Sequence, residues 1–291
     1  MFDKLQSRLE LSGWLTAETA CRIGAGRATE VVGTDLPVVR DALGRPYIPG
    51  SSFKGVLRSR LESLIRAARD HRKLACNPTE TDEWCITAAK IREFKRQLEE
   101  DVRNGKVDRH ERDEVLTQRI INDSCLVCLT FGSPWLASRV LVRDLLVDED
   151  LWFGQFQVRG GVAIDRDTET ASEGKLYDYE VIPPGARFGF HLIVENGEPW
   201  QWGMLFAGLR TIENGSLPIG GSKSRGLGWV KLDLVERRLF SLDGEEGDGR
   251  VEKLISFLDG GGFEEVSDQL IGTWVEAFKK KLTEKAGQVR D

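Results

Sequence analysis

Four of the five cysteines fall into two pairs whose spacing suits metal ligands. One pair is Cys125 and Cys128 in "CLVC", and the other is Cys76 and Cys85 in the longer "CNPTETDEWC". Four thiolates make a closed structural zinc site with no open position for catalysis. The pairs therefore predict a structural zinc ion, and the alternative is a set of reduced, half-buried thiols. The histidines that could replace one thiolate are His71 and His110.

Asp35 is a lone carboxylate in the loop sequence "VVGTDLP". The three histidines are scattered at His71, His110 and His191, so neither a Ser-His-Asp triad nor a two-histidine mechanism is expected. A single carboxylate can instead hold a divalent metal ion or position a nucleophile. The alternative is an ordinary turn residue or cap.

Two stretches combine glycine with Lys or Arg, as phosphate-binding elements do. "IPGSSFKGVLR" begins a helix, whose free N–H groups and dipole suit phosphate. Lys54, Arg58 and Arg66 fall off its apolar stripe, so we expect them to face solvent or a ligand. "PIGGSKSRGLGWV" carries Lys223 and Arg225, and such a loop can wrap around phosphates, although it is no Walker loop because a strand follows. The alternatives are a capped surface helix and a tight turn.

Charge is distributed unevenly along the chain. The net charge is -6, yet residues 37–73 carry nine Lys or Arg against three acids, whereas residues 233–268 carry eleven acids against four bases. Local fields decide where a polyanion can dock, so the sequence predicts a basic N-terminal face on which a polyanion could bind.

Composition indicates an ordinary soluble globular protein, with 40% hydrophobic and 30% charged residues. No apolar run approaches the ~20 residues of a membrane helix. The N-terminal sequence is charged and alternating, unlike a signal peptide. We therefore expect a cytoplasmic protein with no membrane partner.

Apolar periodicity predicts the elements that position these residues. Residues 5–16 alternate polar and apolar, which is the period of a half-buried strand. A helix follows, with Ser51 or Ser52 as its cap. Strand patterns return after residue 128, and residues 200–215 form a second amphipathic helix. This order fits an α+β fold with a ferredoxin-like β-α-β-β-α-β plan, as in RRM-like domains.

The segment bracketed by the cysteine pairs is charged and helical in character, with two helices joined at Asn104-Gly105. It is predicted to be a zinc-binding insertion. The C-terminal segment opens with an acidic, glycine-containing linker and ends in two helices. The division is a core of residues 1–75 and 129–240, an insertion of residues 76–128 and a tail of residues 241–291.

Four stretches occur in a characteristic order: "ETACRIGAG", "GTDLPVVRDALGRPYIPGSSFKGVLR", "GGVAIDRDTETASEGKLYDYEVIPPGARFGF" and "IGGSKSRGLGWV". They resemble the first loop, the Asp loop with its helix start, the thumb and the Gly-rich loop of the RAMP superfamily. The specific resemblance is to the backbone subunits of type III CRISPR effector complexes. The joint occurrence is far more specific than any one motif.

The resemblance implies an RRM-like domain that polymerises along a guide (CRISPR) RNA beside other Cas subunits and copies of itself. A thumb at about residues 159–180 would push between bases of the guide–target duplex. Asp35 takes the catalytic position for target RNA cleavage, which would depend on Mg²⁺ or another divalent ion and resemble attack by the neighbouring 2′-hydroxyl. The RNA contacts expected from the resemblance and the basic helix start are Arg22, Lys54, Arg58, Arg166, Lys223 and Arg225.

The chain departs from the family pattern in two places. Many relatives carry a His in the first loop, whereas Arg22 stands about there in "CRIG". The insertion is absent from shorter relatives, so we expect a zinc-bearing variant. Two alternatives remain: an inactive scaffold that holds guide RNA, and an endoribonuclease that processes precursor guide RNA. The latter is disfavoured because such enzymes usually use a His acid or base, and no His falls in a matched motif.

Overall fold

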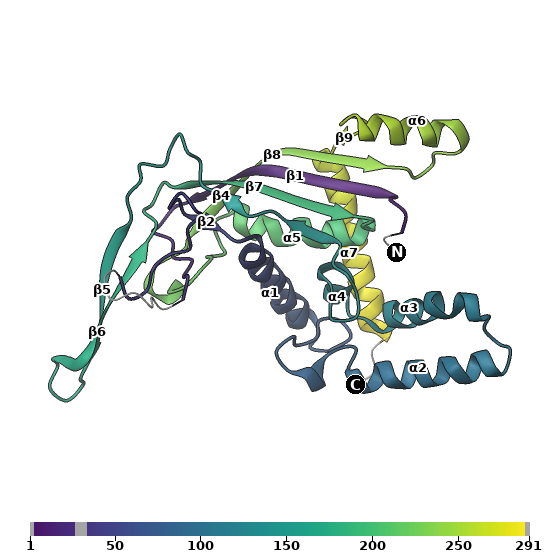
Figure 1. Ribbon diagram of the computed structural model, residues 1–291, viewed down its shortest axis with the longest axis horizontal. Coiled ribbons are helices and arrows are strands. Elements are labelled where there is room, and N and C mark those ends of the chain that lie inside the picture. The colour runs from purple at the N-terminus through teal and green to yellow at the C-terminus, as the bar shows by residue number, and fades with distance from the viewer. Residues whose placement is uncertain (1–2, 27–33, 289–291) are drawn as a thin grey trace.

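An antiparallel sheet forms the centre of the fold in the computed structural model, which describes residues 3–26 and 34–288. Its strand order is β3-β7-β1-β8-β9, so strands from opposite ends of the core sequence lie side by side (Figure 1). The strands are β1 Ser7–Ala17, β3 Val140–Val142, β7 Arg187–Glu195, β8 Val230–Ser241 and β9 Glu264–Glu265.

Two helices complete the ferredoxin-like plan. Helix α1 (Gly50–Ala68) lies between β1 and β3 in the chain, and α5 (Pro199–Glu213) lies between β7 and β8. Both helices cover the same face of the sheet (Figure 1). The order β1-α1-β3-β7-α5-β8 is the β-α-β-β-α-β plan, so the predicted α+β fold is confirmed.

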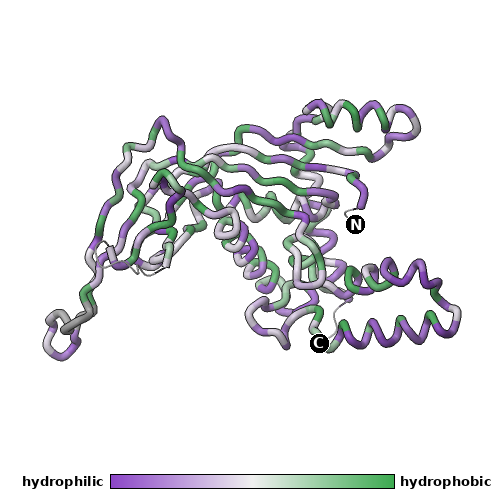
Figure 2. The backbone as a smooth tube through the Cα atoms, in the orientation of Figure 1, coloured by the Kyte–Doolittle hydropathy of each residue, from purple (hydrophilic) through white to green (hydrophobic). Residues whose placement is uncertain are grey.

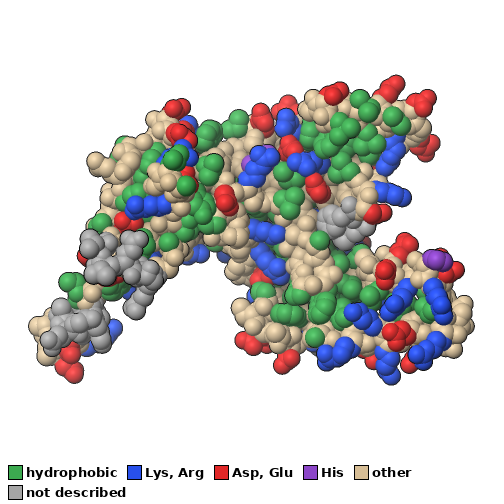
Figure 3. Space-filling view, in the orientation of Figure 1, with side chains coloured by type: hydrophobic (Ala, Val, Ile, Leu, Met, Phe, Trp, Pro, Cys, Tyr) green, Lys and Arg blue, Asp and Glu red, His purple; other side chains and the backbone are tan. Residues whose placement is uncertain are grey.

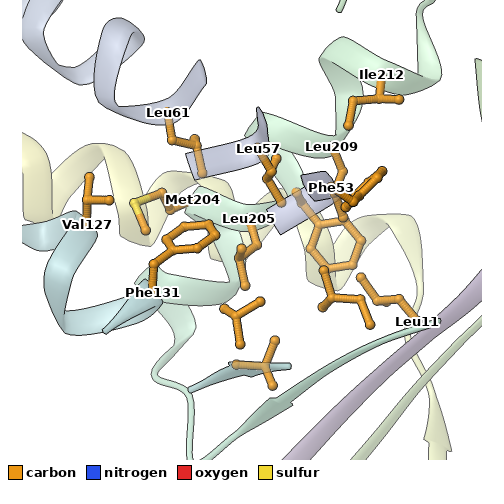
Figure 4. Close-up of a cluster of buried hydrophobic side chains, with 14 of the residues drawn as sticks. Leu11, Phe53, Leu57, Leu61, Val127, Phe131, Met204, Leu205, Leu209 and Ile212 are labelled. Carbon is orange, nitrogen blue, oxygen red and sulfur yellow. The ribbon is translucent and has the colours of Figure 1, made fainter. Parts of the chain in front are cut away.

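The main hydrophobic core lies between this sheet and its helices. Phe53, Leu57 and Leu61 recur every four residues in α1, so their side chains share one face. They lie among Leu11 of β1 and Leu209 of α5 (Figure 4), and all five side chains are at most 1% exposed. Burial of one such side chain contributes about 1.5–3 kcal/mol, so the predicted stripe is what fixes α1 against the sheet.

The C-terminal helix α7 (Asp268–Gln288) packs directly on the core. The ring of Trp274 lies 4.8 Å from that of Trp202 and 5.9 Å from that of Phe206, both in α5. Gly203 of α5 meets the α7 backbone at Trp274 so closely that no side chain would fit there. The C-terminal helix thus belongs to the same packed unit as the sheet.

Helix α6 (Gly247–Leu258) begins shortly after β8 ends, so the expected acidic linker is short. The helix is held near the sheet by aromatic contacts, with the ring of Phe257 4.5 Å from that of Phe240. Lys253 adds an ion pair with Glu245. None of its residues is fully buried.

The insertion between the cysteine pairs forms a two-helix hairpin that projects from the body (Figure 1). The predicted turn is present at Gly105, whose φ of 69° lies in the left-handed region. Both hairpin helices are largely hydrophilic (Figure 2), and many Lys, Arg, Asp and Glu side chains lie on the face of the hairpin seen in Figure 3. The helices of this region are α2 Ala88–Arg103, α3 Arg112–Asp123 and α4 Leu126–Phe131, with short 3-10 turns at Thr81–Glu83 and Arg109–Glu111.

The segment expected to be a thumb forms a β-hairpin that extends away from the sheet (Figure 1). Its strands are β5 (Gln157–Ile164) and β6 (Ala171–Val181). Val162 and Leu176 pair across the hairpin and are 45% and 73% exposed, which leaves apolar surface on this arm. A separate small pair joins β2 (Tyr47–Ile48) to β4 (Leu145–Leu146).

Among the described residues, no helix combines the length and the apolar character needed to cross a lipid bilayer.

Candidate RNA site and cysteine centre

Cys76, Cys85, Cys125 and Cys128 meet in one buried cluster, with all four sulfur atoms within 4.8 Å of one another. The Cys76 sulfur lies 3.5 Å from that of Cys128 and 3.8 Å from that of Cys125. A tetrahedral ion with metal–sulfur bonds of about 2.3 Å places its sulfurs about 3.8 Å apart, so these separations fit a metal such as zinc. Neither histidine considered as a replacement belongs to the cluster.

The segments around the cysteines are held by cations of α1. Cys125 caps α4, and its sulfur accepts a hydrogen bond from the Cys128 N–H at 3.4 Å. Arg58 donates to the Cys128 sulfur at 3.5 Å, and Arg66 donates to the Cys76 carbonyl at 2.8 Å. Both guanidinium groups also pair with Glu62, Arg58 at 2.8 Å and Arg66 at 3.4 Å, so this carboxylate shares the cations with the cysteine segments.

Hydrogen bonds within the cluster shift the pKa values of its thiols in opposite directions. Bonds from Cys125 and Cys128 lower the pKa of the Cys76 and Cys85 thiols. The pKa of the Cys125 and Cys128 thiols is raised. Cys21 is also buried but stands outside the cluster, and burial raises the pKa of its thiol to about 12. The thiolate is the metal-binding form, so Cys76 and Cys85 are closer to that form, whereas Cys125 and Cys128 would lose their protons when a metal binds.

Asp35 is docked at the base of the thumb. Its Oδ2 accepts a hydrogen bond from the backbone N–H of Asp178 in β6 at 3.0 Å. The next residue, Leu36, forms a parallel bridge with Tyr179. Within the part of the chain that the structure describes, the carboxylate is therefore held by the strand that carries the thumb.

The first loop contacts both the Asp35 loop and the Gly-rich loop. The Ala25 N–H donates to the Pro37 carbonyl at 3.0 Å, which joins the first loop to the Asp35 loop. The Gly221 N–H donates to the Arg22 carbonyl at 2.8 Å, which joins the Gly-rich loop to the first loop. Gly220 has a φ of 79° and lies against the Arg22 carbonyl, so a side chain at this position would clash. Segments far apart in the sequence thus converge beside the thumb.

The predicted RNA contacts occupy different parts of this arrangement. Arg22 lies against the Gly-rich loop, and its buried Nε has no partner among the described residues. Arg225 donates to the Tyr177 hydroxyl of β6 at 2.7 Å, and Lys223 is exposed in the same 3-10 turn (Lys223–Arg225). Arg166 is exposed at the hairpin tip, so it is not part of the convergence.

Lys54 and Arg58 turn their polar groups toward the protein itself, which corrects the expectation that they face solvent or a ligand. Lys54 Nζ donates to the Ser138 hydroxyl at 2.7 Å and to the Val140 carbonyl at 3.0 Å. Burial lowers the pKa of Lys54. Arg58 and Arg66 serve the cysteine segments as described above. The apolar stripe could not reveal these partners, because they are distant in the sequence.

The start of α1 also differs from the expectation of a serine cap. The helix begins at Gly50, and neither Ser51 nor Ser52 caps it. Instead the Asp144 carboxylate accepts a hydrogen bond from the Gly50 N–H at 2.8 Å. A carboxylate already satisfies the first N–H of this helix, where the sequence suggested phosphate.

The chain belongs to the RAMP superfamily, which matches residues 14–231. The matched segment contains the first loop, Asp35, the thumb hairpin and the Gly-rich loop.

Relatives named CRISPR system Cms endoribonuclease Csm3 are similar to most of the chain. The protein of Mycobacterium tuberculosis is 29% identical over 82% of this chain and 92% of its own length. That of Methanothermobacter thermautotrophicus is 26% identical over 88% of this chain and 97% of its own. That of Methanocaldococcus jannaschii is 26% identical over 78% of this chain and 79% of its own length.

Proposed function

We propose that this chain is the guide-RNA-binding backbone subunit of a type III CRISPR effector complex and cleaves target RNA endonucleolytically through Asp35. The observation that carries the proposal is the convergence of the Asp35 loop, the first loop and the Gly-rich loop at the thumb base. Cations on two of these loops can bind a phosphate backbone, and the apolar arm beside them can contact bases. The names of the relatives support the same activity.

The chemistry assigned to Asp35 is attack by a 2′-hydroxyl on the adjacent phosphorus. The 2′-hydroxyl gives up its proton as the P–O2′ bond forms, the P–O5′ bond breaks, and the leaving 5′-oxygen takes up a proton. The products are a 2′,3′-cyclic phosphate and a 5′-hydroxyl. The Asp35 carboxylate orients the attacking hydroxyl, and the hydrogen bond from the Asp178 N–H fixes that carboxylate. A divalent ion such as Mg²⁺, when bound, stabilises negative charge on the phosphate.

Zinc is the ion that we assign to the cysteine centre. Its four sulfur ligands and their separations suit zinc, and they leave no open position for a substrate. The centre therefore has a structural role in the insertion, apart from cleavage at Asp35.

The proposed partners are a guide RNA, a target RNA, other Cas subunits and copies of this chain. The test uses the complex assembled on a guide RNA and incubated with a matched and an unmatched target RNA. We expect cleavage of the matched target only, and an intact matched target would favour the inactive scaffold. The protein alone is incubated with repeat-containing precursor RNA, where specific cleavage would favour the processing enzyme.

Loss of a cation from the Gly-rich loop should weaken guide binding with a clear salt signature. Arg225→Ala and Lys223→Ala should each reduce the magnitude of the slope of log affinity against log salt by about 0.7 per lost phosphate contact. The measurement is guide-RNA binding by the isolated chain across salt concentrations.

Lys54→Ala is the informative comparison for this experiment. Because Lys54 holds Ser138 and Val140, we expect its removal to lower thermal stability and to change the slope less than Arg225→Ala does. A larger slope change for Lys54→Ala would assign the phosphate contact to the helix start instead.

A further inference from the structure

Glu180 of β6 is a half-buried carboxylate that grips the Asp35 loop on both sides of the catalytic position. One oxygen, Oε2, accepts from the Val38 N–H at 3.2 Å and from the Arg40 guanidinium at 2.7 Å. The other oxygen, Oε1, lies 3.5 Å from the Thr34 hydroxyl, which is the weakest of the three contacts. Its side chain is only 13% exposed, so these partners replace water around the carboxylate.

The Arg40 side chain, which pairs with Glu180, is held in turn by an aromatic ring. Its guanidinium carbon lies 3.9 Å from the ring centroid of Phe156, just before β5. The Glu180–Arg40 pair therefore joins the Asp35 loop to β6 and, through Phe156, to the segment just before β5. A charge-assisted bond of this kind is shorter and stronger than a neutral one.

Strand β6 also holds the Gly-rich loop, through the Tyr177 hydroxyl and Arg225. Within four consecutive residues, Tyr177 contacts the Gly-rich loop, Asp178 binds the Asp35 carboxylate, and Glu180 binds the flanks of its loop. Strand β6 thus supports both the Asp35 loop and the Gly-rich loop.

We propose that Glu180 is a positioning residue for RNA cleavage, and that β6 transmits the placement of the thumb to Asp35. This inference rests on the proposed function of Asp35. A reacting group held loosely by about 1 Å can lose about 100-fold in rate, so Glu180 acts on the rate of the chemical step. It does so without touching the RNA.

The test compares Glu180→Ala and Glu180→Gln with wild type in the assembled, guide-loaded complex. Single-turnover cleavage is measured at saturating complex, and target binding is measured separately. Glu180→Ala should lower the saturated cleavage rate by ~10- to 100-fold and leave the target Kd within about twofold. Glu180→Gln keeps an acceptor for Val38 but loses the charge, so its rate should lie between those of Ala and wild type.

Glu195→Ala is the matched control. Glu195 also forms an arginine ion pair, with Arg8 at 2.8 Å, but it lies on β7. We expect its cleavage rate to stay within about twofold of wild type, because a partly exposed ion pair contributes little to stability. Melting temperature and complex assembly are recorded for every variant.

Three outcomes overturn the inference: wild-type rates in both Glu180 variants, a fall in rate that merely follows a fall in target binding or assembly, and an equal loss in Glu195→Ala. Asp35→Ala and the Asp35→Ala/Glu180→Ala double variant are run in parallel. Equal residual rates in these two support positioning through Asp35, and a further loss in the double variant contradicts it. Full cleavage by Asp35→Ala would instead remove the proposed function itself.

Discussion

Asp35→Ala is expected to lower cleavage of a guide-matched target RNA by roughly 100-fold or more, because the attacking hydroxyl loses the carboxylate that orients it. Assembly and target binding should remain near wild type, because Leu36 still bridges to Tyr179 and Val38 still binds Glu180. The measurement is single-turnover cleavage by complexes in which every copy of this chain carries the substitution.

Asp41→Ala provides the control for this prediction. Asp41 is a nearby carboxylate that accepts from the Leu43 and Arg45 N–H groups, each at 2.9 Å. Its variant should cleave within about twofold of wild type, as expected for a surface turn. Full cleavage by Asp35→Ala, in a preparation free of wild-type chain, would reduce Asp35 to a turn residue.

A chelator tests independently whether the cleavage step needs a divalent ion. Removal of divalent ions from the wild-type complex should abolish cleavage, and added Mg²⁺ should restore it. Zinc content is measured in parallel, so that loss of the structural ion is not mistaken for loss of the cleavage ion. Cleavage that persists after chelation would contradict the assignment of a divalent ion to this reaction.

Cys125→Ser is expected to remove the bound zinc and to destabilise the region between Cys76 and Cys128. Wild-type protein should contain about one zinc per chain. Structural zinc contributes about 10–16 kcal/mol of apparent binding free energy in zinc-finger peptides, so loss of the ion should lower the melting temperature substantially. Elemental analysis and thermal unfolding check the two parts of this prediction.

Cys21→Ser is the control for this prediction, because it buries a serine hydroxyl in the same way without removing a residue of the cysteine cluster. Cys21 is 0% exposed like Cys125 but lies outside the cluster, so its variant should keep zinc and lose only about 1–3 kcal/mol of stability. Cleavage by the remaining folded Cys125→Ser complex should persist. A wild-type preparation that is free of metal and fully stable would contradict the zinc assignment.

The local sequence pattern predicted much of this fold but few of its long-range polar contacts. The alternation in β1 and the stripe through Phe53 and Leu57 indicate burial, which was enough to predict the order of the core elements. It did not reveal β9 or the packing of α7 on the core. The cysteine cluster was also predictable, because thiol spacing carries chemistry of its own. Lys54 shows the limit: its position off the stripe indicated solvent, yet its partners lie more than 80 residues away.

The residues of the candidate site likewise include some that the sequence motifs indicated and one that they did not. Asp35, Arg22 and Arg225 were found from their motifs, whereas Glu180 was not. The sequence "YDYE" in β6 alternates as a strand does, and nothing in that alternation indicates that Glu180 accepts bonds from a loop 140 residues earlier. Such long-range acceptors become visible only when the sheet register and the thumb are known.

The pairing of β1 with β8 also sets when this protein can fold during its synthesis. β1 lies between β7 and β8, and roughly 200 residues separate its end from the start of β8, so the sheet has a high contact order. At about 5–20 residues per second, β1 waits roughly 10–40 s on the ribosome before β8 exists. Throughout that interval its leucines, which are buried in the folded protein, have no complete core and leave apolar surface on the nascent chain. The four clustered cysteines all precede residue 130, so every one of them is synthesised long before β8.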